Sequence, residues 1–310
     1  MRYTLFIIAF IVFNLLSVKA FEIIKPIPEK ISVNKEKAYL GKLLFHDPIL
    51  SKDRSLSCFS CHDIYKKCGT DHLPIAKGLG GIEEDANTLT VLNAVFNFAF
   101  FWNGRAKDLK EQIIFVFRNP LELNISREEL ERRINNHKLY KNLFKKAYKV
   151  DYITEDLIAD AIAEFEKTLI TPNSKFDLYL KGKVKLSKEE KEGYRLFKEY
   201  GCISCHNGIN LGGNSFQKFG AVIPSEWKPW FVDRYKLTKK EFDKNIYRVP
   251  SLRNVECTYP YFHHGSAKTL EEAVRKMAYH NLGIELETQE VRLIVKFLKT
   301  LTGELPKYEK

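Results

Sequence analysis

Two short segments of the chain carry the residue types most able to do chemistry. "CFSCH" occupies residues 58–62, and "CISCH" occupies residues 202–206, which is 144 residues later. Two thiols at this spacing suit a redox pair or half of a zinc site, but a histidine that follows at once favours covalent haem c. In that chemistry the thiols add to the haem vinyl groups and the histidine ligates the iron. The predicted residues are Cys58, Cys61, Cys202 and Cys205 for attachment, with His62 and His206 as axial ligands.

The start of the chain predicts export. Arg2 precedes an apolar run from Leu5 to Leu16, and "SVKA" then ends at Ala20 in a small-residue cleavage pattern. These features indicate a signal peptide over residues 1–20, because the apolar run is shorter than the ~20 residues of a comfortable membrane span. Lys19 lies unusually close to the cleavage point, so an uncleaved anchor is the alternative. Export predicts a periplasmic protein, in the compartment where haem is joined to cysteine.

The chain is basic, but its pattern of charge does not indicate a nucleic-acid partner. Lys and Arg number 50 against 39 Asp and Glu, which gives a net charge of +11. These residues are spread among glutamates, as in "SREELERRINNHKLYKNLFKKAY", instead of forming a compact basic tract interleaved with aromatic residues. We therefore expect a solvated surface, with an acidic protein partner as the alternative.

The elements that position these groups are predicted to be helices. Capping boxes, in which Ser or Thr is followed three residues later by Glu, begin at Ser126, Ser187 and Thr269. Apolar residues at helical spacing follow, and the sequence lacks long alternating strand patterns. We predict an all-α fold of two haem-binding domains, residues 21–172 and 173–310, with a linker near residues 171–183.

An internal repeat supports two domains. The segment "LTVLNAVFNFAFFWNGRAKDLKEQI", residues 89–113, aligns without a gap to "PSLRNVECTYPYFHHGSAKTLEEAV", residues 250–274, at an offset of 161 and with seven identities. Each segment follows its own Cys-x-x-Cys-His motif, which indicates a duplicated haem domain.

The two copies differ where an iron ligand would lie. Met277 follows the second segment, and the same offset places Val116 in the first copy. A thioether binds iron and an isopropyl group does not, so His/Met ligation is predicted for the second haem and an open face for the first. The alternative is that Met277 is a core residue, because it shares a helical face with Leu270, Ala273 and Val274.

The first haem is expected to be covered by the segment that carries Trp102, Arg105, Gln112 and Glu122. A carboxylate held over a haem can take a proton from iron-bound peroxide and deliver it to the leaving oxygen. Glu122 is the candidate, although most glutamates are simply solvated.

Between Leu40 and Leu301 the chain resembles the bacterial di-haem cytochrome c peroxidases. The motifs that carry the resemblance are "LGKLLFHDPILS", "SCFSCH", "TVLNAVFNFAFFWNGRAKDLKEQ", "FEKTLITPNSKFD", "GCISCH" and "VPSLRNVECTYPYFHHGSAKTLEEAV". The resemblance implies two class I cytochrome c-like domains, each with one covalent haem c, and a calcium ion between them. It also implies reduction of hydrogen peroxide to water with two electrons from a small soluble donor such as a cytochrome c. Members of the family are commonly dimers, so the resemblance allows a homodimer.

The resemblance also assigns roles to residues. The haem on Cys58 and Cys61 becomes peroxidatic, and the haem on Cys202 and Cys205 becomes the site of electron entry. The matching residues are Glu122 as the acid/base, Gln112 beside the peroxide pocket, Trp102 between the haems, Met277 as the distal ligand, and Asn87 with the carbonyls of Thr258 and Pro260 around calcium.

One position departs from the family pattern. Many members place a histidine ligand of the resting peroxidatic haem where this chain has Leu79, and His72 lies seven residues earlier. We expect His72 to be a surface or packing residue and the first haem to be open to peroxide. Cys68 and Cys257 remain after haem attachment, and either a disulfide or two buried thiols fits them.

Two other functions remain open. A di-haem electron carrier would have both irons fully coordinated. An enzyme that oxidises residues of a partner protein, as in methylamine dehydrogenase maturation, would keep the open haem, but that relative has Tyr in place of the distal Met.

Overall fold

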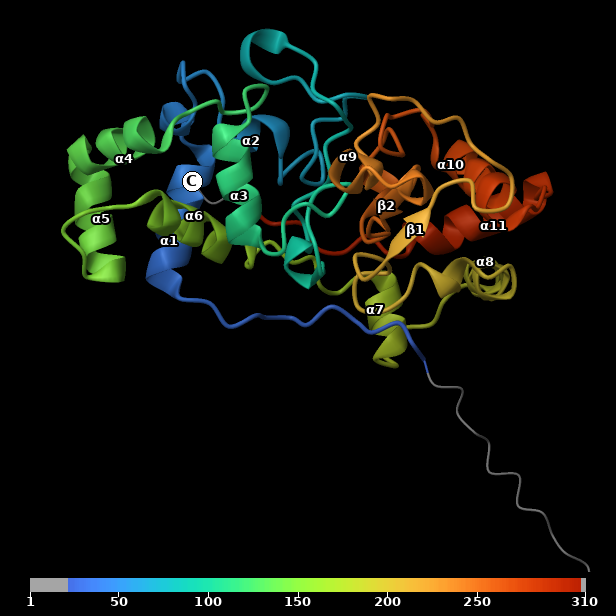
Figure 1. Ribbon diagram of the computed structural model, residues 1–310. Helices are drawn as coiled ribbons and strands as arrows, with labels where there is room; N and C mark the ends of the chain where they lie inside the picture. The colour runs from blue at the N-terminus through green and yellow to red at the C-terminus, as the bar shows by residue number, and fades with distance from the viewer. Residues whose placement is uncertain (1–21, 308–310) are drawn as a thin grey trace, which may run out of the picture.

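The computed structural model describes residues 22–307, and these form two helical lobes that lie side by side (Figure 1). The first lobe contains α1 to α6 and the second contains α7 to α11. The bounds are α1 (Lys35–His46), α2 (Cys58–Cys61), α3 (Leu109–Arg118), α4 (Arg127–Asn136), α5 (Lys138–Tyr148), α6 (Glu155–Glu166), α7 (Lys175–Leu180), α8 (Lys188–Glu199), α9 (Tyr235–Thr238), α10 (Leu270–Met277) and α11 (Thr288–Lys299). The prediction of a helical fold is confirmed.

The predicted helix starts lie where the capping boxes placed them. Ser126, Ser187 and Thr269 are the N-caps of α4, α8 and α10, and each side-chain oxygen accepts from the backbone N–H three residues later. These bonds satisfy amide groups that have no partner inside the helix. The predicted linker is partly wrong, because α7 lies within residues 171–183 and buries Phe176 completely.

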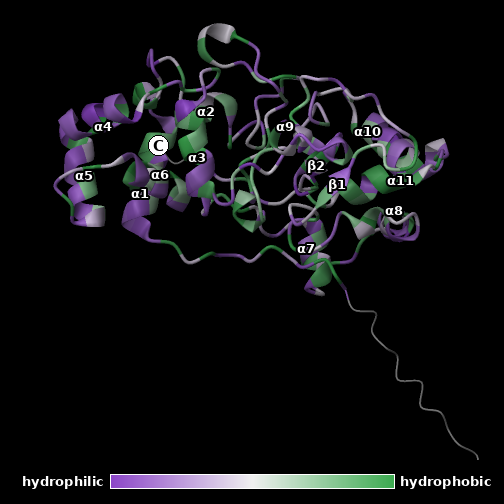
Figure 2. Cartoon of the chain, in the orientation of Figure 1, coloured by the Kyte–Doolittle hydropathy of each residue, from purple (hydrophilic) through white to green (hydrophobic). Residues whose placement is uncertain are grey.

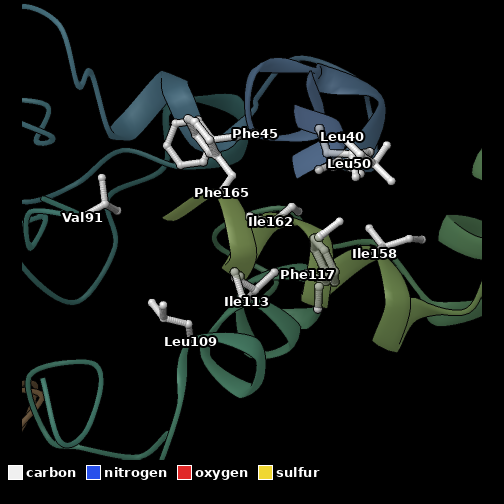
Figure 3. Packing of buried hydrophobic residues seen from close by; sticks show 14 of the residues in the cluster. Leu40, Phe45, Leu50, Val91, Leu109, Ile113, Phe117, Ile158, Ile162 and Phe165 are labelled. Carbon is white, nitrogen blue, oxygen red and sulfur yellow. The ribbon is translucent and has the colours of Figure 1, made fainter. Parts of the chain in front are cut away.

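In the first lobe α1 crosses α6 at a glycine. A Cβ atom at Gly41 would lie 1.9 Å from the carbonyl oxygen of Ala161, so the two backbones touch only because Gly41 has no side chain. Beside the crossing, the rings of Phe45 and Phe165 pack edge to face, with centroids 5.3 Å apart. Figure 3 shows this packing together with Ile158 and Ile162 of α6, which project into the same core.

The second lobe repeats this arrangement. Helix α8 crosses α11 at Gly193, where a Cβ atom would lie 1.9 Å from the carbonyl oxygen of Leu293. The rings of Phe197 and Phe297 lie beside the crossing with centroids 5.1 Å apart. The duplication inferred from the sequence is therefore visible in the packing of both lobes.

The repeated segments meet at one residue. Asn93 and Asn254, which are paired by the repeat, both have left-handed backbones, with φ of 60° and 59°. Both donate a side-chain hydrogen bond to Thr171 Oγ1, at 2.7 and 2.9 Å. The two copies are thus joined through a shared hydroxyl.

A small antiparallel ribbon departs from the all-α prediction. Strand β1 (Phe216–Lys218) pairs with β2 (Ile246–Arg248), with Gln217 opposite Tyr247. It belongs to the second lobe and faces the first, because the Arg248 backbone N–H donates to the Trp102 carbonyl at 2.8 Å.

The chain ends cross between the lobes. Ile24 packs in the core of the second lobe, whereas Leu305 packs against the core of the first. Figure 1 shows the N-terminal segment running along the molecule from the second lobe to α1. A buried ion pair fixes this segment: Arg253 Nη1 lies 2.7 Å from Asp177 Oδ1, and Arg253 Nη2 donates to the Lys25 carbonyl at 2.8 Å.

The predicted signal peptide, residues 1–20, lies outside the described residues. Between residues 22 and 307, no helix has both the length and the apolar character needed to span a bilayer. Figure 2 shows hydrophilic residues prominent on α4, at the outer edge of the first lobe.

Candidate active site between two cavities

The first Cys-x-x-Cys-His motif forms the wall of a cavity in the first lobe. Cys58 and Cys61 begin and end the single turn of α2, and His62 follows as its C-cap. His62 Nδ1 lies 3.0 Å from the Gly69 carbonyl, so Nδ1 carries the proton and Nε2 is left as a ligand atom. Burial lowers the pKa of His62, which keeps the ring neutral, as iron ligation requires.

Most of the predicted catalytic residues line this first cavity. Helix α3 supplies Gln112 and Val116, and the turn after α3 supplies Glu122. Glu122 Oε1 accepts a 2.6 Å hydrogen bond from Asn119 Nδ2, which fixes the carboxyl group in the turn. Burial raises the pKa of Glu122, while the Asn119 bond and the nearby Arg105 guanidinium oppose the shift. The carboxyl group is therefore poised to hold and release a proton nearer neutral pH than an ordinary glutamate.

Three further carboxyl residues, Glu84, Asp85 and Glu166, line the first cavity, and sequence reasoning missed all of them. Burial and the charge of Glu122 raise the pKa of Glu84 to about 8. Burial raises the pKa of Glu166, which is 5 % exposed, to about 8. Glu166 follows Ile158 and Ile162 at intervals of four residues, so helical periodicity would have placed it on the buried face of α6. Glu84 had no comparable signal.

The second motif lines a larger apolar cavity in the second lobe. His206 Nδ1 lies 3.2 Å from the Leu211 carbonyl, and burial lowers the pKa of His206 to about 4, so Nε2 is again the ligand atom. Met277, the last residue of α10, lines this same cavity together with Cys202 and Cys205. The structure thus brings the attachment residues of the second motif and its two predicted axial ligands, His206 and Met277, to the second cavity. It places Val116 in the first cavity.

Trp102 lies in the wall between the two cavities and lines both. Its Nε1–H donates to the Asn87 carbonyl at 2.9 Å, which fixes the indole. Asn87, Thr258 and Pro260, the predicted calcium ligands, all line the second cavity. Within residues 22–307 no group of three or more His, Cys, Asp or Glu side chains is arranged to hold a metal ion. The predicted calcium ligands are amide and carbonyl oxygens, a different class of donor.

A buried cation supports the fit of haem to these cavities. Arg248 is 4 % exposed, lines both cavities, and donates through Nε to the Phe101 carbonyl at 3.3 Å. Among the described residues it makes no ion pair with a carboxylate, and burial alone lowers its pKa to about 10. A buried guanidinium without a counter-ion is costly unless an anion arrives. Haem carries two carboxylates, so Arg248 suits a cavity that holds it.

His72 lines neither cavity and is bonded elsewhere. His72 Nε2 bonds to the Cys257 carbonyl at 2.9 Å, and its ring stacks on Tyr259 with centroids 4.1 Å apart. Leu79 begins a 3₁₀ turn (Leu79–Gly81), and its backbone N–H donates to the Leu121 carbonyl at 3.1 Å. Cys68 and Cys257 form a disulfide with Cα atoms 5.9 Å apart, which resolves the choice that the sequence left open.

Comparison with known proteins gives one family. Residues 35–185 match the di-haem cytochrome c peroxidase family. The chain is 46 % identical to the cytochrome c551 peroxidase of Nitrosomonas europaea, over 93 % of this chain and 86 % of that protein. It is 39 % identical to the cytochrome c551 peroxidase of Pseudomonas aeruginosa, over 94 % and 87 %. A crystal structure of a MauG-like protein associated with microbial copper homeostasis superposes with a TM-score of 0.79 at 26 % identity, over 90 % of this chain and 93 % of that one. The chain therefore belongs to the di-haem cytochrome c peroxidase family.

Proposed function

We propose that the chain is a cytochrome c peroxidase that reduces hydrogen peroxide to water with two electrons from a small soluble donor such as a cytochrome c. The observation that carries the proposal is the difference between the two cavities. Both hold a Cys-x-x-Cys-His motif, but Met277 lines one and Val116 lines the other, beside Glu122 and Gln112. His206 and Met277 would both ligate the iron of one haem and suit it to electron entry, whereas Val116 offers no ligand at the other, which would be left open to peroxide.

The chain's own residues supply proton transfer at the open site. Asn119 holds Oε1 of Glu122, so Oε2 is the atom that accepts the proton of peroxide and returns it to the departing oxygen. Gln112 provides a polar group beside the same space, and Arg105 favours the carboxylate form of Glu122. Haem supplies the iron that binds peroxide and the electrons that reduce it. Trp102 lines both cavities, so it would lie between two haems held there.

The finer assignments follow the same proposal. Residues 21–172 and 173–310 form two class I cytochrome c-like domains, supported by the matched glycine crossings at Gly41 and Gly193. A calcium ion binds Asn87 and the carbonyls of Thr258 and Pro260 between the lobes. Residues 1–20 direct the chain to the periplasm, where two copies of the chain form a homodimer.

Steady-state turnover tests the proposal. Haem-loaded protein, a reduced small cytochrome c and peroxide should give oxidation of two cytochromes for each peroxide consumed. An electron carrier would instead consume no peroxide and would show two low-spin haems in the mixed-valence state.

A further inference from the structure

A buried aromatic pair lies beside Trp102 and has no part in the proposed reaction. Tyr247, on β2, is 5 % exposed, and its ring centroid is 6.3 Å from that of Trp102. His263 is 4 % exposed and stacks on Tyr247 with centroids 4.3 Å apart. Both residues line the second cavity, so the pair sits next to the route between the haems.

The position of Tyr247 relative to Trp102 is fixed by the backbone. The N–H of Arg248, the next residue, donates to the Trp102 carbonyl at 2.8 Å. The β1–β2 pairing holds the other side of the strand, with Tyr247 opposite Gln217. A short and rigid separation between two oxidisable rings is what electron transfer between them requires.

The phenol of Tyr247 also has a base at hydrogen-bond distance. Its hydroxyl oxygen lies 3.1 Å from His263 Nε2. His263 is buried and makes no ion pair among the described residues, so its imidazole is neutral. The phenol O–H donates to Nε2, so the buried hydroxyl has the hydrogen-bond partner that it needs.

Phenol oxidation depends on such a base, because removal of an electron makes the phenol proton strongly acidic. We propose that Tyr247 is a redox-active residue that relays an oxidising equivalent from Trp102 with His263 as its proton acceptor. This inference rests on the proposed function, in which hydrogen peroxide is the oxidant that withdraws electrons from the enzyme. One electron passes from Tyr247 to the one-electron-oxidised indole of Trp102. The phenol O–H bond breaks, and its proton moves to His263 Nε2. The products are neutral Trp102, a neutral tyrosyl radical and an imidazolium.

The consequence is that Tyr247 holds an oxidising equivalent for as long as no electron has arrived from the donor. The neutral radical lies on a buried residue, and the proton held on His263 stays at hydrogen-bond distance for its return when an electron arrives. Phe231, whose ring centroid is 4.4 Å from that of His263, is not readily oxidised and separates the pair from further transfer in that direction.

Electron paramagnetic resonance after rapid freezing tests the inference. Haem-loaded protein is mixed with one equivalent of peroxide without donor, and we expect an organic radical whose signal narrows when the tyrosines are ring-deuterated. Tyr247→Phe, which keeps the stacked ring and removes only the hydroxyl, should abolish the signal. His263→Gln should lose most of it, because the amide does not take up the proton.

Tyr261→Phe is the matched control. Tyr261 is also buried and lines the second cavity, and no hydrogen bond joins its hydroxyl to a base among the described residues. Its variant should retain the full signal. A tyrosyl radical that persists in Tyr247→Phe overturns the inference, and so does wild-type protein that turns over peroxide but forms no radical. Protein that does not react with peroxide at all would refute the proposed function, and the inference with it.

Discussion

Replacing Glu122 by Gln should remove proton transfer while leaving the site intact. The glutamine oxygen can still accept the 2.6 Å hydrogen bond from Asn119 Nδ2, and the side chain has nearly the same volume. We therefore expect unchanged haem spectra and stability. Loss of general acid/base catalysis costs about 10²-fold to 10⁴-fold in rate, or about 2.7–5.4 kcal/mol in the barrier.

The assay should isolate the peroxide step from electron supply. Stopped-flow mixing of enzyme with peroxide, followed at the Soret band, gives the second-order rate constant directly. Glu122 must be ionised to accept the proton, and burial raises its pKa, so the wild-type rate should fall on acidification at a pH above the ordinary glutamate value. That acid limb should vanish in Glu122→Gln.

Two further variants make the result decisive. Glu83→Gln changes an exposed carboxyl group and should leave the rate constant unchanged. Glu84 lines the same cavity and has a pKa of about 8. If Glu122→Gln reacts as fast as wild type while Glu84→Gln is slow, the acid/base assignment is wrong and Glu84 has that role.

Three other predictions address the remaining features. Met277→His should keep the second haem six-coordinate but lower its reduction potential, measured by spectroelectrochemistry; no shift would make Met277 a core residue only. Fully oxidised protein should react with peroxide at once, because Leu79 cannot ligate iron, and Leu79→His should delay that reaction until one electron is added. A wild-type low-spin bis-histidine spectrum would contradict this. Asp177→Asn leaves Arg253 buried without its charged partner, so the free energy of unfolding, measured with urea, should fall by about 3–5 kcal/mol. Asp151 is exposed, so Asp151→Asn should lower the free energy of unfolding by less than about 1 kcal/mol. An equal loss in both variants would show that the buried ion pair does not stabilise the fold.

The sequence predicts this site where function depends on local spacing. The Cys-x-x-Cys-His motifs fix attachment and proximal ligation within five residues, and the constant offset of the repeat pairs Met277 with Val116. Capping boxes locate three helix starts because the bonds involved span only three residues.

What the sequence does not predict depends on contacts between distant segments. Arg248 gives no sign that it is buried between two cavities, because its surroundings come from both lobes. The Cys68–Cys257 disulfide joins residues 189 positions apart, and sequence spacing does not predict a contact over that separation. Helix α7 is missed because its six residues are too few for a periodic pattern.

The crossing of the chain ends sets an order of assembly. The Lys25 carbonyl is bound by Arg253, which follows it by 228 residues. The same N-terminal segment also bonds to Asp177 and Gly208, so all of these partners belong to the second lobe. The α1–α6 crossing needs only residues up to Glu166, so the first lobe can form its core before the segment that precedes it is anchored. The segment that leads into the first lobe is consequently anchored only once the second lobe has formed.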